Sequence, residues 1–116
     1  MSIAILLSTY NGAQFLTQQL DSLFTQSHAS FEVFVRDDGS QDATLEILQG
    51  YDVKLLPSTL NLGSKDSFVA LLNYAVKNSD ADYFMFCDQD DVWYANKVEK
   101  TLAKMKQMEA KYGDIP

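Results

Sequence analysis

Short apolar runs alternate with longer amphipathic segments along the whole chain. Each run has the length of a strand, and in the segments that follow, apolar residues recur at the three- and four-residue spacing of a helix face. Strands are therefore expected at residues 2–7, 31–35, 53–56 and 83–87. Helices are expected at residues 13–26, 64–77 and 95–111, with another that carries Leu45, Ile47 and Leu48. This order predicts an α/β fold, a Rossmann-like and mostly parallel sheet with helices on both faces.

Polar turns follow the expected strands. The run 2–7 is nearly continuous in apolar residues, as in a strand buried on both faces, and it breaks at the turn 8–12. The second strand ends in Arg36-Asp37-Asp38-Gly39-Ser40, in which Ser40 is a candidate helix N-cap, and the fourth ends in Asp88-Gln89-Asp90-Asp91. Open sheets of this kind bind ligands beyond the carboxyl ends of their strands, so a functional site is expected at these turns.

The length and composition are those of one soluble globular domain, which we expect to span residues 1–116. The chain is 47% hydrophobic and 22% charged, and no apolar run approaches the roughly 20 residues of a membrane span. No basic segment precedes a long apolar run, so a signal peptide is not expected. The single cysteine, Cys87, excludes an intramolecular disulfide and a cysteine-based zinc site. A reduced, cytoplasmic location is the expectation that follows.

The net charge of −7 argues against a nucleic-acid partner, because such proteins carry clustered lysines and arginines. Most of the excess acidity lies at the expected strand ends, and the net charge would be −2 without Asp37, Asp38, Asp88, Asp90 and Asp91. Each of these is by itself an ordinary turn or cap residue. Carboxylates brought together repel one another, however, and a bound cation relieves the repulsion. Mg²⁺ and Mn²⁺ suit such a site, because they bind one or two carboxylates together with the phosphate oxygens of a substrate.

The segment after the fourth strand also fits parts of other motifs. An EF-hand loop beginning at Asp88 would have Glu99 at its twelfth position, as required, but Trp93 stands where the sharp turn needs glycine. Neither a dinucleotide-binding glycine motif nor a P-loop follows the first strand. The residues 88–92 match the D-x-D-x-[T/V] motif of haloacid dehalogenase-like phosphatases, with Asp88 as the nucleophile. Those enzymes usually carry this motif on their first strand, so a phosphatase is kept as the alternative.

Several motifs in order resemble the start of the inverting family-2 glycosyltransferases. They are Ser8-Thr9-Tyr10-Asn11-Gly12, Leu20-Asp21-Ser22-Leu23 with Gln26, Asp37-Asp38-Gly39-Ser40 with Asp42 and Thr44, Asn61-Leu62-Gly63, and Asp88-Gln89-Asp90-Asp91-Val92-Trp93. With Cys87 in front of it, the last motif is most similar to the rhamnosyltransferase-like branch. The resemblance covers essentially the whole chain. It implies the N-terminal part of a GT-A fold, which binds a nucleoside-diphosphate sugar.

The resemblance also implies roles for individual residues. Asp38 would accept a hydrogen bond from the imide N–H of uracil or thymine, which suits a carboxylate because it offers only acceptors. Asp37 would support the turn. Asp90 would be the principal ligand of a Mn²⁺ or Mg²⁺ ion, and Asp88 would contact the ribose or the metal. The nucleotide-binding residues are then expected to be Ser8, Thr9, Tyr10, Asn11, Asp38, Lys65 and Asp88.

The implied reaction transfers a sugar from a UDP- or dTDP-sugar to an acceptor hydroxyl with inversion, in the synthesis of cell-surface polysaccharide. The metal would act as a Lewis acid on the leaving diphosphate. The acceptor would be a saccharide or a lipid-linked saccharide, and peripheral association with the cytoplasmic face of the membrane is an expectation.

Family members are normally longer than this chain, and their second half supplies the acceptor surface and the catalytic base. We therefore assign no base within the chain and expect it beyond Pro116, the last residue. The chain would then be the donor-binding part of a longer transferase. A non-catalytic nucleotide-binding fragment is a further alternative. The sequence leaves two alternative roles open for Trp93 and Tyr94, which are packing beneath the loop and contact with the sugar.

Overall fold

A computed structural model describes residues 2–27, 31–56, 58, 60–88 and 92–112 of the chain. Strands and helices alternate along it, as the pattern of apolar residues predicts. The strands are β1 (Ile3–Thr9), β2 (Phe31–Asp37), β3 (Lys54–Leu56) and β4 (Tyr83–Cys87). The helices are α1 (Ala13–Phe24), α2 (Thr44–Leu48), α3 (Ser64–Asn78) and α4 (Lys97–Tyr112). The strands form one parallel sheet in the order β3-β2-β1-β4, so the predicted α/β fold is confirmed.

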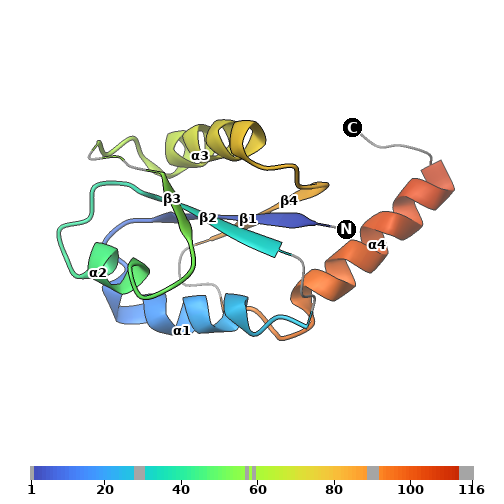
Figure 1. Ribbon diagram of the computed structural model, residues 1–116, viewed down its shortest axis with the longest axis horizontal. Helices are drawn as coiled ribbons and strands as arrows, with labels where there is room; N and C mark the ends of the chain where they lie inside the picture. The colour runs from blue at the N-terminus through green and yellow to red at the C-terminus, as the bar shows by residue number, and fades with distance from the viewer. Residues whose placement is uncertain (1, 28–30, 57, 59, 89–91, 113–116) are drawn as a thin grey trace.

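The central strand β1 is buried along its whole length, because helices cover both faces of the sheet. Figure 1 shows α3 on one face and α1 with α2 on the other. Side chains alternate between the two faces of a strand. Ile3, Ile5 and Leu7 therefore pack on the α1 side, whereas Ala4 and Leu6 pack on the α3 side. Apolar burial on both faces explains why the sequence of β1 reads as a continuous apolar run.

The last helix joins the core on the α1 side through its first two turns. Val98 and Leu102 are buried there, and beyond them Figure 1 shows α4 extending away from the sheet. Among the described residues, no helix is both long enough and apolar enough to cross a membrane.

Two expectations about the strand ends are wrong in detail. Ser8 and Thr9 belong to β1 rather than to a turn, because the ladder between β1 and β2 continues to the pair Thr9–Asp37. Ser40 is not the N-cap of α2, which begins at Thr44 after Ala43. The Ser40 hydroxyl instead donates a hydrogen bond to Asp37 and accepts one from the backbone N–H of Asn11. Ser40 therefore joins two turns at the carboxyl edge of the sheet.

Candidate functional site

A pocket of about 450 Å³ opens at the carboxyl ends of the strands. Its volume lies in the range usual for sites that bind small molecules. Strand order reverses here, because the chain runs from β1 outward to β3 and then returns to place β4 on the other side of β1. Such a reversal is where open α/β sheets bind ligands. The lining residues are Ser8, Thr9, Tyr10, Asp38, Asn61, Gly63, Ser64, Phe68 and Asp88.

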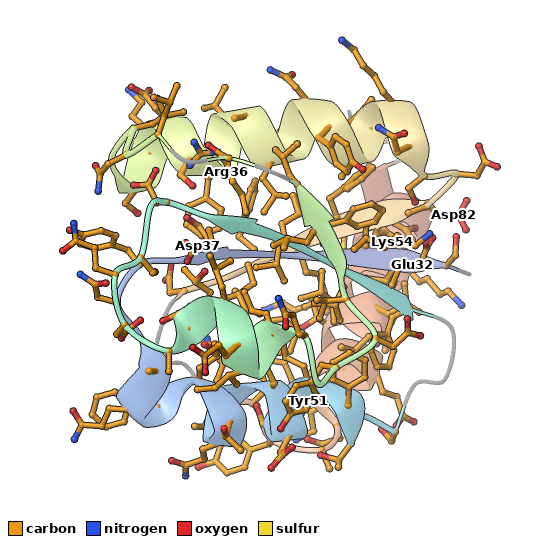
Figure 2. The ribbon with its side chains drawn as sticks, turned by 60° about the vertical axis from the view of Figure 1, so that its left-hand side comes forward. Glu32, Arg36, Asp37, Tyr51, Lys54 and Asp82 are labelled. Atoms are coloured by element: carbon orange, nitrogen blue, oxygen red, sulfur yellow. The ribbon has the colours of Figure 1, made fainter. Side chains whose placement is uncertain are left out.

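The alternation of side chains along β1 and β2 sends neighbouring polar residues to opposite faces. On the α3 side, the hydroxyls of Ser8 and Ser67 share a hydrogen bond of 2.6 Å, and Arg36 donates to Ser67 at 2.9 Å. On the other side, the Thr9 hydroxyl donates to Asp37 at 2.7 Å. Figure 2 shows Arg36 beneath α3 and Asp37 closer to α2.

Arg36 is a buried cation at the back of the pocket, with 2% of its surface exposed. One terminal nitrogen, Nη1, donates to Asp38 Oδ1 at 2.6 Å as well as to Ser67. The other, Nη2, donates to the Ser58 hydroxyl at 2.7 Å and to the carbonyl of Leu60 at 3.0 Å. The guanidinium thus ties Asp38 to α3 and to the segment before it. We did not predict this role, since a single arginine in a turn motif carries no signal of its tertiary partners.

Asp38 accepts two further hydrogen bonds from the segment that leads into α3. The backbone N–H of Leu62 donates to Oδ1 at 2.7 Å and that of Gly63 donates to Oδ2 at 3.0 Å. Gly63 has φ +86° and ψ 160°, a conformation open essentially only to glycine. Burial raises the pKa of the Asp38 carboxyl, but the hydrogen bonds from Leu62, Arg36 and Gly63 outweigh it and lower the pKa below its usual value. Asp38 is therefore a fixed carboxylate in the pocket wall.

Asp37 has a different set of partners, all within the turns. Besides Thr9, it accepts hydrogen bonds from the backbone N–H and the hydroxyl of Ser40, at 2.8 and 2.6 Å. These contacts are those of a residue that supports the turn. Asp37 does not line the pocket, whereas Asp38 and Asp88 do, so these three aspartates do not form one cluster.

The other expected nucleotide-binding residues divide into two groups. Ser8, Thr9, Tyr10 and Asp88 line the pocket with Asp38, and Tyr10 has 46% of its surface exposed. Asn11 and Lys65 do not line it. Asn11 has a positive φ of 47°, and its side chain accepts a hydrogen bond from the backbone N–H of Gln41, so it shapes the turn instead. Lys65 is an exposed residue in the first turn of α3, beside the lining residue Ser64.

Asp88 offers an oxygen ligand to a cation, because its exposed side chain lines the pocket. Asp38 fits a metal poorly, since three protein donors already bind its oxygens. Asp90 and Asp91 lie outside the described residues. Within the part of the chain that the structure describes, no group of three or more potential ligands comes together. Mg²⁺ typically takes one or two carboxylates along with phosphate oxygens, so the chemistry of Asp88 fits such an ion.

The expected position of the catalytic base also falls outside the described residues. The described residues end at Tyr112 in α4, whereas the base is expected beyond Pro116. Its identity therefore stays a prediction about residues that follow this chain.

Helix α1 and the residues just after it hold the segment that follows β4. Gln19 donates to the carbonyl of Asp88 at 2.6 Å, and the Ser22 hydroxyl accepts from the N–H of Trp93 at 3.0 Å. Gln26 donates to the carbonyl of Tyr94 at 2.8 Å. It also accepts a hydrogen bond of 3.0 Å from the backbone N–H at the start of α4. The sequence carries a signal for this support, because Gln19 and Ser22 lie at helical spacing within the apolar stripe of α1 and Gln26 continues that spacing just after the helix.

The two aromatic residues after this loop have separate environments. Trp93 is 7% exposed and packs in the core on the α1 side, where the ammonium of Lys97 lies 5.6 Å from its ring centroid. Packing is therefore its role. Tyr94 is 85% exposed, but it does not line the pocket. Its backbone accepts a hydrogen bond from Gln26, which follows the end of α1 that is remote from the pocket.

Comparisons with known proteins connect this geometry to a family. The model of "Glycosyl transferase family 2" matches residues 4–112. An uncharacterised glycosyltransferase of Rickettsia typhi is 31% identical over 109 residues, which are 94% of this chain and 33% of the relative. The dTDP-rhamnosyl transferase RfbG of Shigella flexneri is 31% identical over 102 residues, 83% of this chain and 35% of the relative. The chain thus spans about a third of the length of these relatives.

A solved structure shows the same architecture. Residues 1–349 of Staphylococcus aureus TarS, in complex with UDP, superpose with a TM-score of 0.79 at 28% identity. The match covers 94% of this chain and 33% of that one. The fold, the position of the pocket and the family match agree, and the chain belongs to glycosyl transferase family 2.

Proposed function

We propose that this chain binds the nucleoside-diphosphate sugar in an inverting, metal-dependent glycosyltransferase. The observation that carries the proposal is the pocket at the strand ends, with the carboxylate of Asp38 fixed in its wall. The similarity to TarS, solved with UDP, and to a dTDP-rhamnosyl transferase supports a UDP- or dTDP-sugar as the donor. Uracil and thymine share the imide edge that Asp38 would bind.

Within this site, the chain's own residues bind and orient the donor. Asp38 accepts the imide N–H of the base, Tyr10 lies beside the nucleoside, and Ser8 and Thr9 form the floor at the end of β1. Asp88 and Asp90 would hold a divalent cation. When bound, the cation neutralises the diphosphate and stabilises the charge that develops on it as it leaves. No residue of this chain is assigned as the catalytic base.

The acceptor and the location remain proposals as well. We expect the acceptor to be a saccharide or a lipid-linked saccharide. We also expect the enzyme to act at the cytoplasmic face of the membrane. The activity of a whole transferase would need residues beyond Pro116 for the acceptor site and the catalytic base. A reading frame that ended at codon 116 would contradict the proposal that this is the donor-binding part of a longer enzyme.

Calorimetric titration of UDP and dTDP into the chain, with and without Mn²⁺, tests the proposal. Binding should require the metal and should weaken about tenfold or more in Asp38→Asn, because the amide places a donor where an acceptor is needed. Asp90→Ala should abolish the metal-dependent binding.

The matched control for these variants is Asp82→Asn, which changes an aspartate at the opposite edge of the sheet (Figure 2). Equal binding by Asp38→Asn and Asp82→Asn would contradict the proposed site. Release of phosphate from a generic phosphoester, abolished in Asp88→Asn, would favour the phosphatase instead. Nucleotide binding without transfer by the full-length protein would indicate a non-catalytic module.

A further inference from the structure

The hydrogen bonds that Asp38 already accepts limit the ligand groups that its carboxylate can bind. We propose that Arg36 is a positioning residue that leaves Asp38 a single acceptor position, so that the pocket selects a base with one ring N–H and rejects guanine. This inference rests on the proposed nucleotide site. It adds the physical means by which that site would distinguish one class of base from another.

The argument begins with the number of acceptor positions on the carboxylate. A carboxylate offers about four lone-pair positions, two on each oxygen. On Oδ1, both are taken, by Arg36 at 2.6 Å and by the N–H of Leu62 at 2.7 Å. On Oδ2, the N–H of Gly63 takes one at 3.0 Å. Among the described residues nothing else donates to Asp38, and one position on Oδ2 is left.

The second step is that Arg36 cannot leave Oδ1 without a large loss. Both terminal nitrogens of its guanidinium donate twice, and the partners come from the turn after β2, from α3 and from the segment before α3. The side chain is buried, so releasing Asp38 would leave a buried charge without its counter-ion. Oδ1 is thereby withheld from any ligand.

The third step is the hydrogen-bonding edge of each base. Uracil and thymine present one N–H between two carbonyls, which one acceptor satisfies. Guanine presents a ring N–H and an amino group side by side, and a carboxylate satisfies both only if both of its oxygens are available. Here the guanine amino group would face an oxygen that already has two donors. A donor buried without an acceptor costs enough to lower affinity about tenfold.

The lowered pKa of Asp38 is consistent with this selection. Burial raises that pKa, but the hydrogen bonds from Leu62, Arg36 and Gly63 lower it further than burial raises it. The group is therefore a carboxylate at neutral pH and accepts hydrogen bonds without donating any. Cytosine has no ring N–H in a nucleotide, and its ring N3 is an acceptor that would face the carboxylate without a hydrogen bond.

The test compares two purine nucleotides that differ by one amino group. GDP carries the amino group and IDP lacks it, so ring size is matched between them. Binding to the chain is measured by competition with UDP in the presence of Mn²⁺. We expect UDP to bind best and IDP to bind about tenfold more tightly than GDP. In Arg36→Met, which frees a position on Oδ1, the difference between IDP and GDP should disappear even if all affinities fall.

The controls separate this role from general support of the fold. Lys54→Met removes a cation that pairs with Glu32 at the opposite end of the sheet (Figure 2), and it should leave the ratio of IDP to GDP affinity unchanged. Arg36→Lys keeps a cation beside Asp38 and should restore the preference for IDP. If Arg36→Met does not fold, the comparison of IDP with GDP in the unaltered chain still tests whether the pocket rejects the guanine amino group.

Each contrary result has its own meaning. Equal binding of IDP and GDP by the unaltered chain overturns the inference, while binding of UDP leaves the proposed function standing. If neither purine binds either protein, ring size rather than donor number excludes guanine, and the inference is wrong. If none of the nucleotides binds, the proposed function and the inference that rests on it both fail.

Discussion

Asp37 and Asp38 are adjacent carboxylates with opposite surroundings. Asp37, on the face of the sheet covered by α1 and α2, binds the hydroxyl of Thr9 and the turn at Ser40. Asp38 binds Arg36 and the backbone before α3. The difference follows from the alternation of side chains along an extended strand. One aspartate therefore stabilises the turns, while the next is left to face a ligand.

This separation makes a prediction for Asp37. Asp37→Ala leaves the Thr9 hydroxyl and the N–H of Ser40 without their acceptor, which should lower the free energy of unfolding by about 1–3 kcal/mol. Urea denaturation measures the change. The exposed Asp52 provides the control, since Asp52→Ala should have little effect. Equal stability of the two variants would show that Asp37 does not support the turn.

At the scale of elements, α1 connects the sheet to the segment after β4. Its apolar residues Leu16, Leu20 and Leu23 enter the core. Polar residues on the same side of α1, and Gln26 just after it, bind the backbone between β4 and α4. The buried amide of Gln26 reaches farthest along the chain, with one hydrogen bond to Tyr94 and another to Val98 in α4. The docking of α4 therefore depends on a residue outside it.

We expect Gln26→Leu to loosen the start of α4. The change removes an acceptor from the N–H of Val98 and a donor from the carbonyl of Tyr94, both in buried or half-buried surroundings. Hydrogen exchange at the Val98 amide should become faster by about tenfold or more.

The matched control is Gln18→Leu, the same change at an exposed position of α1. It should leave that exchange rate unchanged. A similar rate for Val98 in both variants would mean that apolar packing alone holds α4.

At the scale of the whole molecule, acid stability should depend on carboxylates whose hydrogen bonds join separate elements. The hydrogen bond from the Thr44 hydroxyl lowers the pKa of Asp42, and the N–H groups of Thr44 and Ala13 lower it further. Burial raises this pKa, but by less than the hydrogen bonds lower it. For Asp38, hydrogen bonds outweigh burial and also lower the pKa. The two carboxylates thus tie α2 to α1 and β2 to α3.

Because these folded-state pKa values lie below the unfolded value of about 3.9, both groups stabilise the fold at higher pH. That stabilisation is lost as the pH falls through the folded-state pKa. The free energy of unfolding should therefore be steady near neutral pH and decline below about pH 4. In Asp42→Asn the decline should be smaller. Urea denaturation across this range measures it, and a profile as steep in the variant as in the unaltered chain would contradict the prediction.

The alternation of strands and helices, the faces of the sheet and the edge that carries the site could all be predicted from the sequence. These features depend on local periodicity, which a chain displays wherever one face of a strand or helix must be buried. The ordered motifs also identify the family, and they place Ser8, Asp38 and Asp88 at the ends of three strands. Parallel strands necessarily bring those ends to one edge.

The tertiary structure decided what each polar residue does at that edge. Arg36 meets Ser58 and Ser67 only when α3 folds over the sheet, and Gln19 meets Asp88 only when β4 returns beside β1. Ser40 serves the turns rather than a helix cap because β1 and β2 continue two residues further than their apolar runs. A hydrogen bond between residues tens of positions apart leaves no periodic trace in the sequence, since it depends on where the backbone brings two side chains rather than on their spacing.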